Sequence, residues 1–133
     1  MFHYNIPISK KTKKKDKCSS GHEKARNLLK KIFPLHFIVE ELRLPGTKEG
    51  LKKDLYADFF VFEINLVVEV HGQQHYEYTP FFHNTIQDFF ESKKRDRRKK
   101  DWCELNNITY IELSDKEDVD EWERKIKSIL YGD

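Results

Sequence analysis

The sequence predicts a mixed α/β fold in which helices flank a small central sheet. Two apolar runs, residues 56–62 and 66–71, alternate as strands do and lie close enough in the chain to form a hairpin. A segment with the helical spacing of apolar residues precedes them, and a helix, strand, helix pattern follows. With one further strand before the hairpin, the expected order of elements is α-β-β-β-α-β-α.

The first helix is expected to begin at Ser20 and to end before Pro34, which cannot continue a helix. Ser20 and Glu23 have the spacing of a capping box, in which the two side chains satisfy backbone N–H groups of the first turn. The apolar stripe that would bury this helix comprises Ala25, Leu28, Leu29 and Ile32.

Turn signals separate the elements on both sides of the hairpin. A strand over residues 36–44 is expected to end at the Pro45-Gly46 turn, and a charged loop then leads to the hairpin. Gly72 breaks the second hairpin strand, and residues 73–83 form an aromatic-rich loop.

The last third of the chain predicts a long helix over residues 85–106, a strand over 108–113 and an amphipathic helix over 119–131. The Asn106-Asn107 pair is typical of the end of a helix, where asparagine tolerates the left-handed conformation. The apolar residues expected on the buried side of the long helix are Ile86, Phe89, Phe90, Trp102 and Leu105.

Composition limits the protein to one domain. A chain of 133 residues with 38% hydrophobic and 14% aromatic residues can build a single core. We expect a flexible basic arm over residues 1–18 and one domain over residues 19–133. No apolar run approaches the roughly 20 residues that cross a membrane, and the N-terminus lacks the apolar core of a secretory signal. Two cysteines build no disulfide framework, so a cytoplasmic, reducing environment is expected.

The formal net charge of +2 conceals two strongly basic runs. Residues 10–17 hold six lysines against one aspartate, and residues 93–100 hold seven basic residues against one aspartate. Each run alone could be a solvated face. Together they favour a polyanionic partner, because lysine and arginine bind the phosphates of nucleic acids. The basic residues of the second run are Lys93, Lys94, Arg95, Arg97, Arg98, Lys99 and Lys100.

Two acids, Asp58 and Glu69, interrupt the apolar runs of the hairpin. A hairpin loop centred on Glu63-Ile64 would pair Asp58 with Glu69, and directly opposed side chains lie about 5 Å apart. Alternation along the strand then places His71 on the same face as Glu69. Buried acids that are forced together in this way are typical of a divalent-cation site.

Four segments in order resemble the PD-(D/E)XK nuclease superfamily. They are the helix start SSGHE, the strand YADFFVF, the strand and turn VVEVHGQQHY, and the late segment DRRKKDWCELNNITYIEL. The small single-domain nucleases similar to the very-short-patch repair endonuclease, often carried by phages and mobile elements, are the nearest branch. The resemblance covers roughly residues 19–131 and implies a restriction-endonuclease-like sheet.

The resemblance also implies roles for individual residues. Asp58 and Glu69, with the backbone carbonyl of Val70, would hold Mg²⁺ or Mn²⁺. His71 stands where these nucleases usually have a lysine, and either His71 or His75 would act as general base or acid. Glu23 matches an acid of the first helix that reaches the metal in many members, or it is only the capping partner of Ser20. Gln73 and Gln74 could contact phosphate.

The function implied is metal-dependent endonucleolytic cleavage of DNA, with the basic runs holding its backbone. The alternatives are a non-catalytic nucleic-acid-binding module on the same fold, and a nuclease directed at RNA or at branched junctions. The residues leave the DNA structure, any sequence preference and the oligomeric state open, a homodimer being one option.

Overall fold

The computed structural model describes residues 19–48, 50, 52–72 and 86–132, and the elements follow the expected order. The elements are α1 (Ser20–Ile32), β1 (Ile38–Leu44), β2 (Leu55–Val61), the 3-10 turn η1 (Phe62–Ile64), β3 (Leu66–His71), α2 (Ile86–Leu105), β4 (Thr109–Ser114) and α3 (Val119–Tyr131). The predicted mixed α/β class and the order α-β-β-β-α-β-α are confirmed. The predicted basic arm, residues 1–18, lies outside the described residues.

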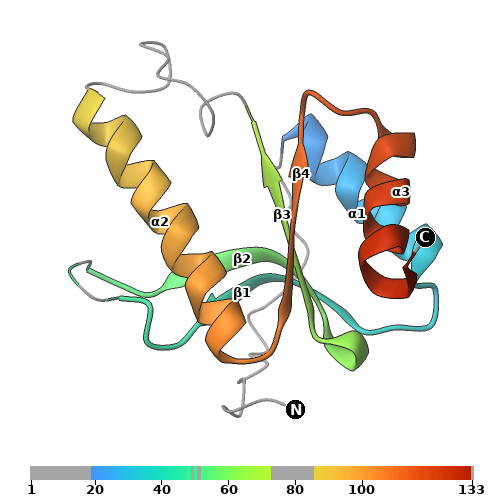
Figure 1. Ribbon diagram of the computed structural model, residues 1–133, viewed down its shortest axis with the longest axis horizontal. Helices are drawn as coiled ribbons and strands as arrows, with labels where there is room; N and C mark the ends of the chain where they lie inside the picture. The colour runs from blue at the N-terminus through green and yellow to red at the C-terminus, as the bar shows by residue number, and fades with distance from the viewer. Residues whose placement is uncertain (1–18, 49, 51, 73–85, 133) are drawn as a thin grey trace.

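The four strands form one sheet in the order β1-β2-β3-β4. The first three strands are antiparallel neighbours, whereas β4 runs parallel to β3. A parallel neighbour requires a crossover connection, and α2 lies within the segment that makes it. As Figure 1 shows, α2 lies on one side of the sheet, while α1 and α3 lie side by side on the other.

Each face of the sheet has its own apolar core. Phe59, Val68 and Ile111 pack with α1 and α3, whereas Phe60 and Val67 pack with α2. Most of these strand side chains are fully buried, as expected for a sheet that is covered on both faces. Trp102 and Cys103, which α2 contributes to its side of the core, are 6% and 0% exposed.

The hairpin has the register that the sequence predicts. Phe60 pairs with Val67 and Phe59 with Val68, which is the pairing that aligns residue 58 with residue 69. The connection is the 3-10 turn η1, after which Asn65 adopts a left-handed conformation with φ of 51°. Asparagine tolerates this conformation better than most residues, which explains its place at the end of the turn.

Two details of the helices differ from the prediction. Ser19 rather than Ser20 caps α1, and its hydroxyl accepts a hydrogen bond from the backbone N–H of His22. The capping box between Ser20 and Glu23 is therefore wrong by one residue. The end of α2 is as expected, since Asn107 has a positive φ of 57° just after the helix.

The buried side of α2 is predicted correctly at Trp102 but not at Ile86, Phe90 and Leu105. Ile86, Phe90 and Leu105 are 57%, 50% and 76% exposed. The buried residues of α2, Trp102 and Cys103, both lie near its C-terminal end. Only this part of the helix packs in the apolar core, so the spacing of apolar residues along the whole helix does not identify its buried side. Across the described ranges, no helix is long and apolar enough to cross a membrane.

Candidate functional site

The two acids of the hairpin are tied to each other's strand through the backbone. Oε2 of Glu69 accepts a hydrogen bond of 2.6 Å from the N–H of Asp58, and Oδ2 of Asp58 accepts one of 2.9 Å from the N–H of Val70. The recorded strand pairing of β2 with β3 ends one residue earlier, at Phe59 and Val68. The carboxylates thus take over the hydrogen bonds of the ladder at the point where the ladder stops.

The same point interrupts the alternation of β1 and β2. Val39 and Leu42, which are three residues apart, pack on the same side of the sheet, and so do Ala57 and Phe60. Strict alternation would place each such pair on opposite faces. Glu41, between the two β1 residues, has a φ of 54°, a left-handed conformation that is uncommon for glutamate. Strained backbone of this kind often lies at functional sites, where the surrounding structure holds it in place.

Both carboxylates lie on the side of the sheet that α2 covers. Nζ of Lys99, from the middle of α2, donates a hydrogen bond of 2.8 Å to Oε1 of Glu69. Asp58 lines a pocket of about 340 Å³ together with residues of α2, and we call this the carboxylate pocket. Its lining residues are Glu41, Leu55, Tyr56, Asp58, Ser92, Arg95, Asp96 and Lys99. The prediction that the two acids share one face is confirmed.

Burial and charge separate the two acids of this pair. Burial, and next the charge of Glu69, raise the pKa of Asp58 to about 6. Burial would also raise the pKa of Glu69, but His71, Lys99 and the N–H of Asp58 outweigh it and lower that pKa. Glu69 is therefore the permanent anion of the pair, and Asp58 is the acid that takes up a proton first.

Lys99 is the cation that balances Glu69. Its side chain is only 16% exposed, although it carries a charged ammonium group. Burial would lower the pKa of Lys99, but Glu69 and Asp58 raise it. The sequence placed Lys99 among residues that hold nucleic acid, whereas the structure points it into the carboxylate pair. Lys99 follows Asp96 by three residues and Arg95 by four, and all three line the same pocket. Residues at this spacing share one side of a helix, so a helical wheel groups Lys99 with the other two.

His71 lies beside the pair as predicted, but its charge does not suit a general base. Its Nε2 is 3.9 Å from Oε1 of Glu69 and 3.9 Å from Oδ1 of Asp96, and its Nδ1 is 3.2 Å from Oε2 of Glu112. Burial would lower the pKa of His71, but these three carboxylates raise it to about 9. The imidazole is thus protonated at neutral pH and cannot accept a proton. His75, Gln73 and Gln74 lie outside the described residues.

Glu23 is not brought to the carboxylate pair. It is exposed on α1, which packs against the opposite face of the sheet. His22 and Arg26 are the polar residues of α1 that bind a carboxylate of the sheet. Nε2 of His22 lies 2.9 Å from Oε1 of Glu40, and Nε of Arg26 donates to Oε2 of Glu40 at 2.8 Å. The sequence did not single out this buried cluster, since its members lie in separate elements.

The structure divides the second basic run among several surfaces. Arg95 and Lys99 line the carboxylate pocket, whereas Lys94, Arg97 and Arg98 lie on another side of α2. Lys93 lies over the ring of Phe89, with its Nζ 5.8 Å from the ring centroid. Lys100 is exposed, and its charge helps to lower the pKa of Glu112.

The carboxylates of Asp58 and Glu69 could bind a divalent cation, but they do not form a complete coordination sphere by themselves. Within the part of the chain that the structure describes, no three Asp, Glu, His or Cys side chains converge as a metal-binding group. Asp58 and Glu69 converge, and the N–H of Val70 places the Val70 backbone beside Asp58. Lys99 occupies the position next to Oε1 of Glu69. A cation bound there would therefore share or replace the contact of the ammonium group.

Two viral proteins are similar to the chain. The uncharacterized protein 307L of Invertebrate iridescent virus 6 is 37% identical over 60 residues, which cover 45% of this chain and 30% of that protein. The uncharacterized protein 033L of Invertebrate iridescent virus 3 is 31% identical over 98 residues, which cover 71% of this chain and 48% of that protein. The chain thus spans less than half the length of these two relatives. No family model and no solved structure matches the chain.

Proposed function

We propose that the protein is a metal-dependent endonuclease that hydrolyses phosphodiester bonds in DNA. The observation that carries this proposal is the pair of half-buried Asp58 and buried Glu69, in which Glu69 meets the ammonium of Lys99 at 2.8 Å. Two acids held together in a core are costly, because one of them must keep a charge with little water around it. A fold that served no chemistry there would be more stable with apolar residues at these positions.

The two carboxylates would hold Mg²⁺ or Mn²⁺, and the resemblance assigns a third oxygen to the backbone carbonyl of Val70. Hard divalent cations prefer oxygen ligands, and often keep several waters in addition to one or two carboxylates. An incomplete protein donor set therefore fits such an ion. A bound ion would supply Lewis-acid stabilisation of the charge that develops on the phosphate.

Lys99 and His71, whose Nζ and Nε2 lie 2.8 Å and 3.9 Å from the same Oε1 of Glu69, would both support the reaction. In the nucleases that the sequence resembles, a lysine two residues after the second acid helps to position the attacking water. Here residue 71 is a histidine, and α2 delivers an ammonium to the same acid instead. We assign to Lys99 the orientation of water and the neutralisation of phosphate charge. His71, protonated and held by Asp96 and Glu112, would orient Glu69 and donate rather than accept a proton.

One observation favours the non-catalytic alternative. The contact between Lys99 and Glu69 is also what a structural ion pair looks like, and a pair of this kind needs no metal. A nucleic-acid-binding module on the same fold would keep the pair and bind DNA through its basic residues. The two functions differ in one respect that can be measured, since only the enzyme cleaves.

The test is cleavage by the purified protein with Mg²⁺, with Mn²⁺ and with EDTA. Plasmid, duplex, branched DNA and RNA of matched sequence would be compared, because the residues do not choose among them. We expect cleavage with either metal and none with EDTA. Asp58→Asn should abolish it, while Asp120→Asn, which changes an exposed acid of α3, should leave it unchanged. DNA binding without cleavage under every metal condition would overturn the enzyme and leave the binding module.

We further propose that this activity takes place in the cytoplasm. Cys103 is a free, buried thiol, which suits a reducing cytoplasm, where DNA and divalent cations are both accessible. The oligomeric state of the active form is left open by the proposal, a homodimer being one option.

A further inference from the structure

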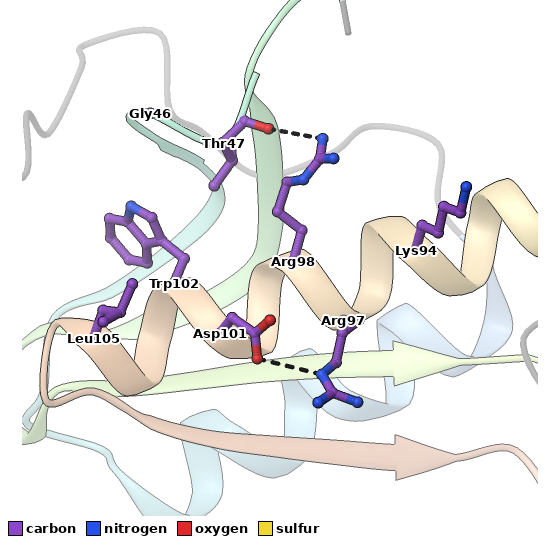
Figure 2. A pocket seen from close by; sticks show the side chains of 8 residues that line it. All are labelled: Gly46, Thr47, Lys94, Arg97, Arg98, Asp101, Trp102 and Leu105. Carbon is purple, nitrogen blue, oxygen red and sulfur yellow. Dashed lines mark hydrogen bonds and ion pairs between the residues drawn. The ribbon is translucent and has the colours of Figure 1, made fainter. Parts of the chain in front are cut away.

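A second pocket lies on another side of α2, next to the turn that follows β1. It has a volume of about 430 Å³, and we call it the Thr47 pocket (Figure 2). Three cationic side chains and one acid surround an apolar base. The lining residues are Gly46, Thr47, Lys94, Arg97, Arg98, Asp101, Trp102 and Leu105.

The wall of this pocket is fixed by hydrogen bonds between α2 and the turn. The indole N–H of Trp102 donates to the carbonyl of Pro45 at 2.7 Å, and Nη1 of Arg98 donates to the carbonyl of Thr47 at 3.3 Å. The hydroxyl of Thr47 in turn accepts a bond of 2.8 Å from the N–H of Leu55 and donates one of 2.7 Å to the carbonyl of Leu44. The turn and the helix therefore form one rigid surface, as Figure 2 shows for Thr47 and Arg98.

The outer cations of the pocket reach into solvent. The side chains of Lys94 and Arg97 are 69% and 78% exposed. Among the described residues, Arg97 pairs with Asp101 at 3.3 Å and Lys94 with Glu91 at 3.7 Å, and exposed pairs of this kind contribute little to stability. A phosphate of the substrate can therefore bind these cations at little cost in free energy.

We propose that the Thr47 pocket binds the sugar-phosphate backbone of the substrate strand next to the phosphate held at the carboxylate pair. This inference rests on the proposed nucleic-acid substrate. Three cations against one acid suit a polyanion, and Leu105 and Trp102 offer an apolar surface to the sugars. The two pockets adjoin at Thr47, because its hydroxyl accepts a hydrogen bond of 2.8 Å from the N–H of Leu55, which lines the carboxylate pocket.

The proposed backbone contact involves only one side of the basic helix α2. Lys93 and Lys100 belong to the same basic run and are exposed, but they line neither of the two pockets. Lys93 contacts the ring of Phe89, and Lys100 lies near the carboxylate of Glu112, which would repel a phosphate. A nucleic-acid strand that binds in the Thr47 pocket would therefore not contact these two lysines.

Two double variants with equal loss of charge test the choice. Lys94→Ala with Arg97→Ala removes two cations of the pocket, and Lys93→Ala with Lys100→Ala removes two exposed cations outside it. Binding of a fluorescent DNA duplex is measured in EDTA over a range of salt concentrations, so that no cleavage occurs. Because all four residues are exposed, both variants should fold, and thermal unfolding of each checks this.

We expect the pocket variant to bind about tenfold more weakly or worse, with a slope of log affinity against log salt that is lower by about 1.8 for two lost phosphate contacts. The control variant should bind within about threefold of the wild type. Equal losses in the two variants, or a larger loss in the control, would overturn the inference. Should the pocket variant not fold, Lys94→Gln alone gives the same comparison against Lys93→Gln.

These results are separate from the test of cleavage. A wild-type protein that binds DNA through the pocket but never cleaves would leave this inference standing and remove the proposed hydrolysis. A protein that cleaves, but whose two double variants bind alike, would keep the proposed hydrolysis and remove the pocket.

Discussion

Nζ of Lys99 lies 2.8 Å from Oε1 of Glu69, joining α2 to β3 across 30 residues of sequence. The side chain of Glu69 is almost completely buried, and that of Lys99 is 16% exposed. The contact satisfies Glu69, so that Asp58 is the acid of the pair whose charge is least compensated, and its pKa is raised to about 6. The site thus contains the ion pair of Glu69 with Lys99 and, at Asp58, a carboxylate that could bind an added cation.

The first prediction is that Asp58→Asn makes the protein more stable at pH 7. The pKa of Asp58 rises from 3.8 in the unfolded chain to about 6 in the folded protein, so ionisation opposes folding at neutral pH by about 3 kcal/mol at most. Asparagine removes this charge and can still accept the hydrogen bond from the N–H of Val70. Chemical denaturation at pH 7 should show the gain.

The pH dependence provides the control for this variant. A raised carboxyl pKa costs stability as pH rises from about 4 to 6, because over this interval the unfolded chain releases the proton of Asp58 while the folded protein still holds it. Below pH 4 the wild-type Asp58 is neutral, and the advantage of the variant should vanish. A variant that is less stable than the wild type at pH 7 would mean that the charge of Asp58 supports the fold.

The second prediction is that Lys99→Met lowers stability in the absence of divalent cations, by roughly 3–5 kcal/mol, because it leaves Glu69 buried without its partner. Mg²⁺ should restore part of this loss if it binds where the ammonium lies, since a ligand that binds only the folded state stabilises it. Thermal unfolding with increasing Mg²⁺ measures the effect. A matched variant, Lys100→Met on the exposed side of α2, should show neither the loss nor the gain.

The hairpin and its acids could be predicted because the information is local. Three residues separate the two apolar runs, and this spacing sets the register of Phe60 with Val67. The register in turn brings residue 58 to residue 69. The burial of two acids then follows from their place in apolar sequence, without any knowledge of the helices.

The partners of the pair could not be predicted in the same way. Lys99 reaches Glu69 only because α2 crosses the sheet at a particular rotation, and seven basic residues in one run conceal which of them points inward. The resemblance implies a metal-site role for Glu23, and its spacing from Ser20 offers a capping role instead, but the cap is Ser19 and Glu23 is exposed. A shift of one residue on a helix turns a side chain by about 100°, so that the neighbour His22 faces the sheet instead.

The third prediction concerns the charge of His71. Its pKa rises from 6.5 to about 9, so the protonated ring contributes stability that is complete below about pH 6.5 and is lost as pH rises through 9. The stability of the wild type should therefore fall by about 3 kcal/mol between these values. His71→Gln should remove this dependence. A wild-type profile that stays flat over this interval would mean that the ring is neutral, and would return it to the role of a base.

The fourth prediction separates the two acids that lie near α1. Glu40→Ala leaves Arg26 and His22 without their shared carboxylate in a buried cluster, and should lower stability by roughly 3–5 kcal/mol. Glu23→Ala changes an exposed side chain and should alter stability by less than about 0.5 kcal/mol.

Cleavage by the same two variants then tests the role that the resemblance gives to Glu23. At a temperature where both variants are folded, we expect Glu23→Ala to cleave at the rate of the wild type, because the structure keeps this residue on α1, which packs against the opposite face of the sheet from Asp58 and Glu69. Glu40→Ala should also cleave once it is folded, since its partners lie on that opposite face. A folded Glu23→Ala that has lost cleavage but still binds DNA would show that α1 contributes to the metal site after all.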